Sequence, residues 1–407
     1  MARLSTEEAA ARLGVKKETI YAYVSRGILG REKAVDGKAS TFDADEVDRL
    51  RRRRVHAHPG RLEATVSTNV AEVRNGHVAY RGTPIDEVAA RAMGYEQTAA
   101  LLWDVPETGP WSAPSELVTA IEASIALLGP AATLVDQLLT STVVAGSHDP
   151  FRHSRDPLSA TQSVQQLVAA SVDAMALRGK QRQSRTKLNE TPTIANRLWP
   201  RLTTAPQSHA DILDQALMLL ADHGMASSTL AARIAASTRG GPHAAIIAGL
   251  GALNGPLHGA ASQSVHDLLV RAETSGVETA IAETLRNHGK IPGIGHFVHR
   301  TSDPRFTLMM ESIAASSLPK KRLSVVNAVV EQTAERIAAP HNIDLALGSL
   351  TYVADMAPDA GELIFAIARI VGWTAHALEE HNEAPLRFRP VGRYEAVRPR
   401  SAPVDLA

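Results

Sequence analysis

Long apolar stretches with a helical period constrain the fold of this chain more than any other feature. Alanine and leucine dominate the sequence after residue 85, whereas aromatic residues make up only 4 % of its 407 residues. Alternating runs of β-branched residues are scarce, so the pattern predicts helices rather than strands. Glycine and proline interrupt the apolar stretches. The predicted helices cover residues 212–221, 244–253, 323–337 and 363–378. We therefore expect a mainly α-helical fold with a large all-helical core.

Composition sets the broad class of the protein. The length exceeds one average domain, so we expect two or three cores. Lys plus Arg and Asp plus Glu each number 43, which gives no global attraction to nucleic acid. Cysteine is absent, which excludes disulfides, thiolate nucleophiles and zinc-thiolate sites. No apolar run approaches the roughly 20 residues needed to cross a bilayer, and no signal-peptide core is present. We expect a soluble, cytoplasmic protein with no membrane partner.

Three widely separated segments, each punctuated by Gly or Pro or opened by Asn, present two histidines and a carboxylate. They are residues 255–259 with His258, residues 292–296 with His296, and residues 342–344 with Asp344. Removing a proton from the carbon next to a thioester carbonyl requires a positioned base and a donor aimed at the carbonyl oxygen. Asp344 suits the base and His258 the donor. His296 suits the group that polarises a ketone and protonates the developing alkoxide, so the set predicts carbon–carbon bond formation from a thioester.

These segments, in this order, resemble the signature regions of the citrate synthase family. Further resemblances lie at residues 221–233 around His223, at Asp303-Pro304-Arg305, at residues 365–376, and at Arg389-Pro390. Residues 80–82 and 94–103 are similar to the family's N-terminal region. The resemblance covers roughly residues 61 to 396 and implies an all-helical enzyme with a large and a small domain.

The resemblance implies a reaction and a set of roles. Acetyl-CoA, as co-substrate with no other cofactor, would condense with oxaloacetate to give citrate and CoA. His258 and Asp344 would enolise acetyl-CoA, and His296 would act on the ketone. The residues implied to hold oxaloacetate are His223, Arg305, Phe365, Arg369 and Arg389, the last from the partner subunit of a homodimer. The residues implied to bind CoA are Lys290, Ile291, Pro292, Gly293, Ile294, Gly295 and Arg300.

Departures from the family pattern keep alternatives open. The residues after His258, His223 and Asp344 are more apolar than the family's, which leaves the identity of the 2-oxo acid and the turnover rate open. One alternative is a 2-methylcitrate synthase using propionyl-CoA, because one methylene cannot be read from motifs. Another is a metabolite-sensing DNA-binding protein with a synthase fold. His296 and His299 also have the spacing of a metal-binding pair, but without a clear third ligand we expect no metal site.

The first residues predict a separate module. Ser5 with Glu8 three positions on indicates a capping box that starts a short helix, and a second helix follows from Lys17 to Arg26. The pattern resembles a helix-turn-helix of the MerR and excisionase type, with a wing turn at Asp36-Gly37 and a third helix over residues 43–54. Such a second helix enters the major groove of DNA. The candidate DNA contacts are Lys16, Lys17, Thr19, Tyr21 and Arg26.

The expected domain boundaries follow from these two resemblances. Residues 1–55 form the helix-turn-helix domain, residues 56–62 a linker, and residues 63–407 the catalytic region, with a small domain at approximately 261–360. For the N-terminal module the alternative to DNA binding is a helical unit that only docks on the enzyme or sets its assembly. The arginine run 51–54 is interpreted as a solvated helix end, and residues 179–186 as a surface loop.

Overall fold

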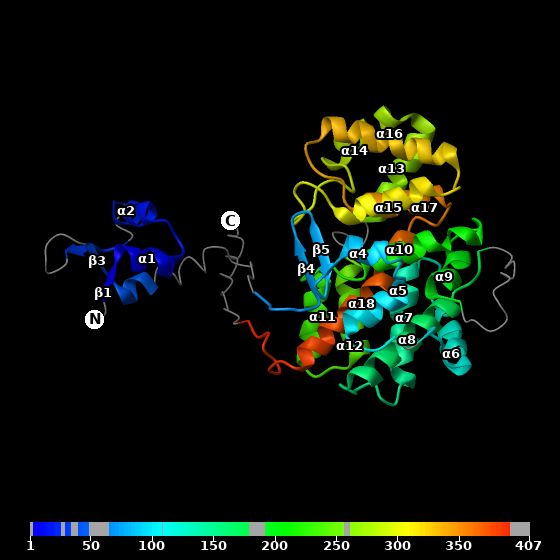
Figure 1. Cartoon of the computed structure of the whole chain (residues 1–407), viewed down its shortest axis with the longest axis horizontal. Helices are drawn as coiled ribbons and strands as arrows, with labels where there is room; N and C mark the ends of the chain where they lie inside the picture. The colour runs from blue at the N-terminus through cyan, green and yellow to red at the C-terminus, as the bar shows by residue number, and fades with distance from the viewer. Residues whose placement is uncertain are drawn as a thin grey trace, which may run out of the picture. The chain divides into compact units, whose positions relative to one another are not determined.

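The computed structural model describes residues 3–25, 29–33, 40–48, 65–107, 109–178, 192–255 and 261–390 (Figure 1). The chain divides into two compact units, residues 1–66 and residues 67–407.

The first unit packs two helices against a small sheet. It consists of β1 (Arg3–Ser5), α1 (Thr6–Leu13), α2 (Lys17–Ser25), β2 (Glu32–Lys33) and β3 (Ser40–Asp43), with antiparallel strand order β1-β3-β2. Ile20 of α2, Phe42 of β3 and Val47 are fully buried in one small core. Residues 44–48 are helical and begin the predicted third helix. The rest of that helix, the wing turn at Asp36-Gly37 and Arg26 lie outside the described residues.

Local sequence signals explain where α1 begins and ends. The Ser5 hydroxyl accepts a hydrogen bond from the Glu8 N–H, and the Glu8 carboxylate accepts one from the Ser5 N–H. Gly14 ends the helix in the left-handed conformation, with φ +62°, which costs a residue without a Cβ little. The predicted capping box is therefore confirmed.

The second unit begins with a β-hairpin that the helical pattern did not predict. Strands β4 (Ala71–Arg74) and β5 (His77–Tyr80) pair antiparallel around Asn75-Gly76, and β6 (Thr83–Pro84) pairs with β5. Gly76 has φ +70°, and an Asn-Gly pair between short apolar strands is a strong hairpin signal. The buried Tyr80 hydroxyl lies 3.1 Å from the Met218 carbonyl and 3.2 Å from the Asp222 carbonyl. The hairpin is thereby fastened to the turn that carries His223.

Helices form the rest of the second unit. The four helices predicted from apolar periodicity are confirmed as α10 (Ala210–Leu220), α12 (Pro242–Leu253), α16 (Lys320–Arg336) and α18 (Ala360–His381). In chain order the helices are α4 (Ile85–Ala90), α5 (Tyr95–Trp103), α6 (Ser115–Ile125), α7 (Leu134–His148), α8 (Pro157–Asp173), α9 (Ile194–Leu202), α10 (Ala210–Leu220), α11 (Ser227–Ser237), α12 (Pro242–Leu253), α13 (Ala261–Ser275), α14 (Val277–His288), α15 (Pro304–Ala315), α16 (Lys320–Arg336), α17 (Ile343–Val353) and α18 (Ala360–His381).

Helix α18 is the centre of this unit. It packs against α5, α7, α8, α10, α11, α12, α13 and α17, and nearly all of its residues are buried. Gly372 permits the close approach of the α10 end, because a Cβ there would lie 2.5 Å from the Ala221 carbonyl oxygen. Within the described part of the chain, α18 is the helix long and apolar enough to cross a membrane. It is buried over 94 % of the tested window, as a core helix is.

Helices α13, α14 and α16 pack on one another at one end of the second unit, and α15 and α17 lie between them and α10 and α18 (Figure 1). These helices fall in the range predicted for a small domain, whose border stays a prediction. The layer of α15 and α17 brings the residues around 305 and 344 next to the central helices.

Candidate active site

The turn after α10 carries the first predicted site residue. Asp222 and His223 follow the helix end, and Gly224 turns the chain away with φ +62°. The Asp222 carboxylate accepts a hydrogen bond of 2.7 Å from the Gly224 N–H, which fixes this turn. His223 is therefore held on a short, rigid corner between α10 and α11.

Two loops distant in sequence pair beside this corner. The Asn342 N–H donates to the Gly293 carbonyl at 2.9 Å, and the Gly295 N–H donates to the Pro340 carbonyl at 2.8 Å. Gly293 has φ +76°, and a Cβ there would lie 2.7 Å from the Cβ of Leu345. Glycine is thus required at 293 by both the backbone conformation and the packing. The pairing places the loop that carries His296 alongside the start of α17.

Asp344 lies in the first turn of α17. Asn342 caps this helix, because its side-chain oxygen accepts a hydrogen bond of 2.9 Å from the Asp344 N–H. Desolvation raises the pKa of Asp344 to about 6, although the nearby Arg305 and Arg369 act against the shift. A carboxyl group with a pKa close to neutral pH suits general base catalysis.

Three histidines, His223, His296 and His299, form a compact group that we call the histidine cluster. Their ring centroids lie 4.8 to 5.2 Å apart. The Nε2 atoms of His223 and His299 are 3.0 Å apart. The Nδ1 of His296 accepts hydrogen bonds of 3.0 Å from the backbone N–H groups of Val298 and His299. Because that nitrogen is an acceptor, a neutral His296 carries its proton on Nε2 and can donate it to a ligand.

The histidine cluster is a poor place for positive charge. Desolvation, followed by the charge of Arg305, lowers the pKa of His296 to about 4. Desolvation and the charges of Arg305 and Arg369 also lower the pKa of His223 well below its usual value. Near neutral pH these rings are therefore neutral hydrogen-bond donors and acceptors.

Two buried arginines face the cluster. Arg305 is 2 % exposed and forms a fork with Asp303, with nitrogen–oxygen distances of 3.0 and 2.8 Å. Arg369 is 1 % exposed; its Nε donates to the Leu220 carbonyl, and its guanidinium lies 4.5 Å from the Phe365 ring centroid. Buried guanidinium groups are suited to gripping carboxylates. The structure thus gathers His223, His296, Asp344 and these two arginines.

Other predicted site residues are not brought into this group within one chain. Arg389, Lys290 and Arg300 are exposed. The Arg300 guanidinium lies 5.8 Å from the centroid of the Phe297 ring, which is itself 85 % exposed. His258 lies outside the described residues.

Two side chains with a place in this site were missed by the sequence reasoning. His299 was considered only as half of a metal pair, and Asp303 only as part of a motif. Asp303 also accepts a hydrogen bond of 3.1 Å from the Ile343 N–H, which connects the start of α15 to the start of α17. The described residues contain no group of three or more His, Asp or Glu side chains able to hold a metal ion.

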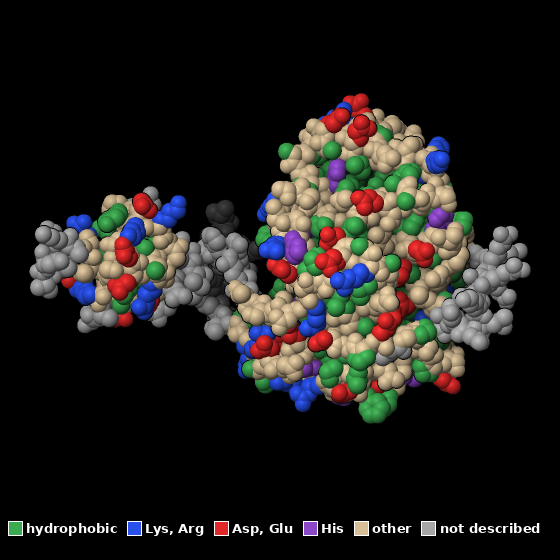
Figure 2. All heavy atoms as spheres, viewed as in Figure 1, with side chains coloured by type: hydrophobic (Ala, Val, Ile, Leu, Met, Phe, Trp, Pro, Cys, Tyr) green, Lys and Arg blue, Asp and Glu red, His purple; other side chains and the backbone are tan. Residues whose placement is uncertain are grey.

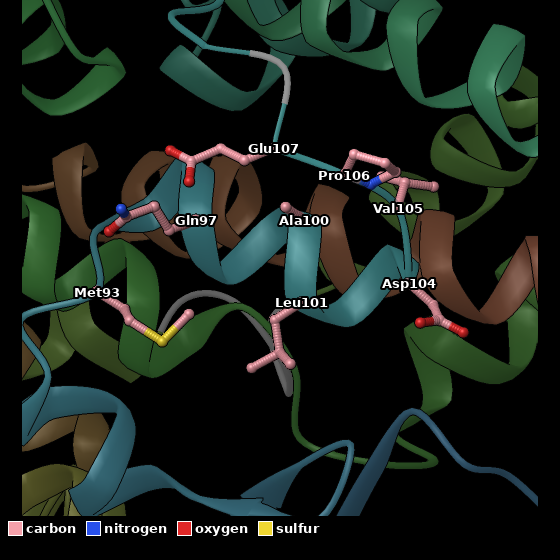
Figure 3. A pocket seen from close by; sticks show the side chains of 8 residues that line it. All are labelled: Met93, Gln97, Ala100, Leu101, Asp104, Val105, Pro106 and Glu107. Carbon is pink, nitrogen blue, oxygen red and sulfur yellow. The ribbon is translucent and has the colours of Figure 1, made fainter.

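The structure also contains an open groove along α5 that is separate from this site (Figure 3). Its volume is about 520 Å³. Its lining residues are Met93, Gln97, Ala100, Leu101, Asp104, Val105, Pro106 and Glu107. None of the predicted site residues lines this groove.

In the first unit, Lys16, Lys17 and Tyr21 are exposed, and Thr19 is partly buried. Lys17 forms an ion pair with Glu7, and Glu18 of the same helix is exposed as well. Lys and Arg side chains are interspersed with Asp and Glu on the visible face of this unit (Figure 2). The exposed side of α2 therefore carries both signs of charge.

Comparisons with known proteins match both units. A family model described as "Citrate synthase, C-terminal domain" matches residues 62–399, and one described as "Helix-turn-helix domain" matches residues 3–55. The chain is 27 % identical to 2-methylcitrate synthase 1 of Corynebacterium glutamicum, over 82 % of this chain and 93 % of that protein. It is 26 % identical to a citrate synthase of Mycolicibacterium smegmatis, over 84 % and 94 % of the two chains.

Solved structures share the fold. A ternary complex of carboxymethyl coenzyme A and oxaloacetate with citrate synthase from Thermoplasma acidophilum matches with a TM-score of 0.65. It is 21 % identical and covers 86 % of this chain and 97 % of that one. Citrate synthase from Thermotoga maritima matches with a TM-score of 0.63 at 23 % identity, over 84 % and 95 % of the two chains. At these identities the likeness is one of fold.

Proposed function

We propose, because the chain belongs to the citrate synthase family of condensing acyltransferases, that it condenses acetyl-CoA with oxaloacetate and hydrolyses the product to citrate and CoA. One observation carries the proposal. Asp344, a carboxyl group with a pKa of about 6, interacts with the same two buried guanidinium groups, Arg305 and Arg369, that help to lower the pKa of His223. This combination provides a base, a neutral donor and charges for a dicarboxylate.

The first step is enolisation of the thioester. Asp344 removes a proton from the methyl carbon of acetyl-CoA, and His258 donates a hydrogen bond to the carbonyl oxygen as the enolate forms. The raised pKa of Asp344 supports this role, since the carboxylate is ionised above pH 6 and is still a stronger base than an exposed Asp. Activity should fall as the pH is lowered through about 6.

The second step is attack of the enolate carbon on the ketone of oxaloacetate. His296 polarises the ketone and supplies the proton for the alkoxide from Nε2. The two backbone N–H groups at its Nδ1 support this assignment, because they leave Nε2 as the protonated nitrogen. His223, Arg305 and Arg369 hold the two carboxylates, and Phe365 packs against the ligand. Thioester hydrolysis then releases citrate and CoA.

The remaining predicted residues complete the proposal. The glycines of residues 290–295 allow the backbone to approach CoA, and Arg300 binds its phosphates. Arg389 acts from the partner subunit of a homodimer. Closure of the small domain shields the enolate from water. We expect the enzyme in the cytoplasm.

The acyl group is the finer question, and the names of the relatives support two answers. 2-Methylcitrate synthases and a citrate synthase match at nearly equal identity. Propionyl-CoA differs from acetyl-CoA by one methylene, which is worth about 1–3 kcal/mol in a pocket. The same base and donors serve both substrates.

A substrate panel tests the proposal. CoA release is followed with acetyl-CoA and with propionyl-CoA, each against oxaloacetate, pyruvate, 2-oxoglutarate and no 2-oxo acid. We expect the largest kcat/KM with acetyl-CoA and oxaloacetate and no release without a 2-oxo acid. A larger kcat/KM with propionyl-CoA would instead make the enzyme a 2-methylcitrate synthase. No release with any pair would overturn the enzymatic proposal and favour a metabolite sensor.

We also propose that the first unit binds duplex DNA through α2. The helix-turn-helix match and the exposed Lys16, Lys17 and Tyr21 support this, with Thr19 and Arg26 as further contacts. A homodimer presents two copies, which strengthens weak individual contacts. Binding of the full chain to a random duplex pool at low salt should weaken as salt is raised. Equal binding by the wild type and by Lys16→Glu/Lys17→Glu would contradict contact through α2, and no binding by the wild type would show that the unit serves only docking or assembly.

A further inference from the structure

We propose that His299 is a positioning residue for the 2-oxo acid: it holds His223 as a neutral imidazole with its proton on Nδ1. The inference rests on the proposed function, because it treats His223 as a ligand of the substrate. His299 itself is fully buried and is placed to act through His223.

The tautomers follow from a backbone donor. The Gly76 N–H donates to His299 Nδ1 at 3.2 Å. An amide N–H can only donate, so this Nδ1 holds a lone pair, and the proton of a neutral His299 is on Nε2. That Nε2 lies 3.0 Å from His223 Nε2. His299 therefore donates and His223 Nε2 accepts, which leaves Nδ1 as the protonated nitrogen of His223.

The same reasoning applies across the histidine cluster. The Nδ1 of His296 is occupied by two backbone N–H groups, the Nδ1 of His299 by Gly76, and the Nε2 of His223 by His299. Every ring thus has its single acceptor nitrogen engaged. A further proton can enter only if one of these hydrogen bonds breaks.

The charged side chains around the histidine cluster also favour uncharged imidazoles. Arg305 of α15 and Arg369 of α18 both disfavour an imidazolium at His223. Asp303 is the carboxylate that approaches His299, with Oδ1 3.9 Å from Nε2, and the fork of Arg305 already occupies it. The pKa values of all three histidines are correspondingly lowered, with desolvation as the main cause.

The tip of the β-hairpin formed by β4 and β5 contacts both the loop after His296 and the His299 ring. Its tip holds the loop after His296, because Asn75 Oδ1 accepts hydrogen bonds from the N–H groups of Arg300 (2.7 Å) and Thr301 (3.2 Å). Gly76, beside it, sets the tautomer of His299. Among the described residues no acceptor engages two donors, Nδ1–H of His223 and Nε2–H of His296, which can therefore serve a ligand. Both are set before the ligand arrives, which reduces the cost of binding.

Two variants of His299 distinguish the effect of its Nε2–H donor from the effect of the rest of its ring. His299→Asn places an amide near the former Nδ1, where it can accept from Gly76 but cannot reach His223. His299→Gln places an amide N–H near the former Nε2 and keeps the donor. We expect the KM for oxaloacetate to rise roughly three- to tenfold in His299→Asn and to stay within about twofold in His299→Gln. The KM for acetyl-CoA should stay unchanged in both.

A spectroscopic readout makes the test independent of turnover. In full-length protein labelled with ¹⁵N-histidine, the His223 signal, assigned by its loss in His223→Gln, should show the Nδ1–H tautomer. In His299→Asn it should change to a mixture or to Nε2–H. An Nε2–H tautomer in the wild type would overturn the proposal, as would equal KM values for oxaloacetate in the Asn and Gln variants. If the wild type releases no CoA, the proposed function fails, but the tautomer still decides this inference.

Discussion

Two groups of buried polar side chains in the second unit avoid unpaired charge in different ways. In the histidine cluster, desolvation lowers the pKa of each imidazole, and hydrogen bonds from the backbone and from a neighbouring ring occupy the acceptor nitrogen of the uncharged form. Near the end of α18, four charged side chains form what we call the α18 ion cluster: Arg233, Glu379, Glu380 and Arg387. Arg233 and Glu380 are both fully buried, and Arg233 Nε lies 2.9 Å from the Glu380 carboxylate.

The two clusters differ in whether they leave hydrogen-bonding groups available for a ligand. In the α18 ion cluster, Arg233 pairs with Glu379 and Glu380, and Glu380 also receives the fork of Arg387 at 2.6 Å. The charges therefore satisfy one another. Among the described residues, the histidine cluster instead leaves the N–H donors of His223 and His296 without a protein acceptor, beside Arg369, whose Nε donates to a backbone carbonyl and not to a carboxylate. The α18 ion cluster is therefore suited to stabilising the fold, and the histidine cluster is suited to binding a ligand.

The two clusters are connected through His376. Arg233 Nη1 donates to His376 Nδ1 at 3.0 Å, so the His376 proton lies on Nε2, 3.3 Å from the Asp222 carboxylate. Asp222 precedes His223 in the chain. The α18 ion cluster thus lies, through His376, next to the corner that carries a site residue, although it contributes no group to the site.

The largest effect should come from the base. Asp344→Asn removes the proton acceptor and should lower kcat roughly 10²–10⁴-fold. The measurement is CoA release with acetyl-CoA and oxaloacetate. Asp86→Asn, at an exposed carboxylate of α4, is the matched control and should leave kcat unchanged. A kcat within tenfold of the wild type would remove Asp344 from the mechanism.

The second effect concerns the α18 ion cluster. Arg233→Met leaves Glu379 without its buried partner and Glu380 with one cation instead of two, and should lower the free energy of unfolding by about 3–5 kcal/mol. Urea unfolding measures this change. The control is Arg91→Met, which breaks an exposed pair with Glu87 at 2.8 Å and should change nothing measurable. Equal losses in the two variants would contradict the distinction between buried and exposed pairs.

Both clusters also show where sequence reasoning ends. The periodicity of residues 212–221 and 363–378 predicted α10 and α18, because burial of an apolar face dictates a helical period. The segments carrying His223, His296 and Asp344 were predicted to meet, and the hydrogen bonds of Gly293 and Asn342 explain how two of them do.

What the sequence did not reveal depends on partners far along the chain. The role inferred for His299 depends on the N–H of Gly76, 223 positions earlier. The α18 ion cluster depends on Arg233, which was seen only as part of a motif. The hairpin around Asn75-Gly76 was missed although that pair is a local signal, because the helical composition of the chain outweighed it. The roles of the site residues stay predictions.

Asp344 should affect stability in the opposite direction to activity. Its pKa in the folded state, about 6, lies above that of an unfolded Asp. The folded protein therefore gains stability from this group at low pH and loses it as the pH rises through 6. Asp344→Asn has no group that ionises here, so it does not lose this stability. The free energy of unfolding of the variant minus that of the wild type should therefore be about 2 kcal/mol larger at pH 8 than at pH 4. Urea titrations at both pH values measure the difference.

If Asp344→Asn is inactive and more stable than the wild type at pH 8, then the buried ionised carboxylate that catalysis requires lowers the stability of the folded protein. Removing a charge from the α18 ion cluster should instead lower the stability of the folded protein. A pH-independent difference between Asp344→Asn and wild type would contradict the raised pKa.

The smallest effect should come from the edge of the α18 ion cluster. Arg387 is 26 % exposed at its side chain and binds the same carboxylate that Arg233 binds from inside. Arg387→Ala should lower the free energy of unfolding by only about 1 kcal/mol, because Glu380 keeps its buried partner and water replaces the lost fork. Arg387→Lys keeps the charge without the fork and should fall between Ala and wild type. If Arg387→Ala destabilised the protein as much as Arg233→Met, burial would not be what distinguishes these two arginines, and the segment after α18 would have to be counted as part of the core.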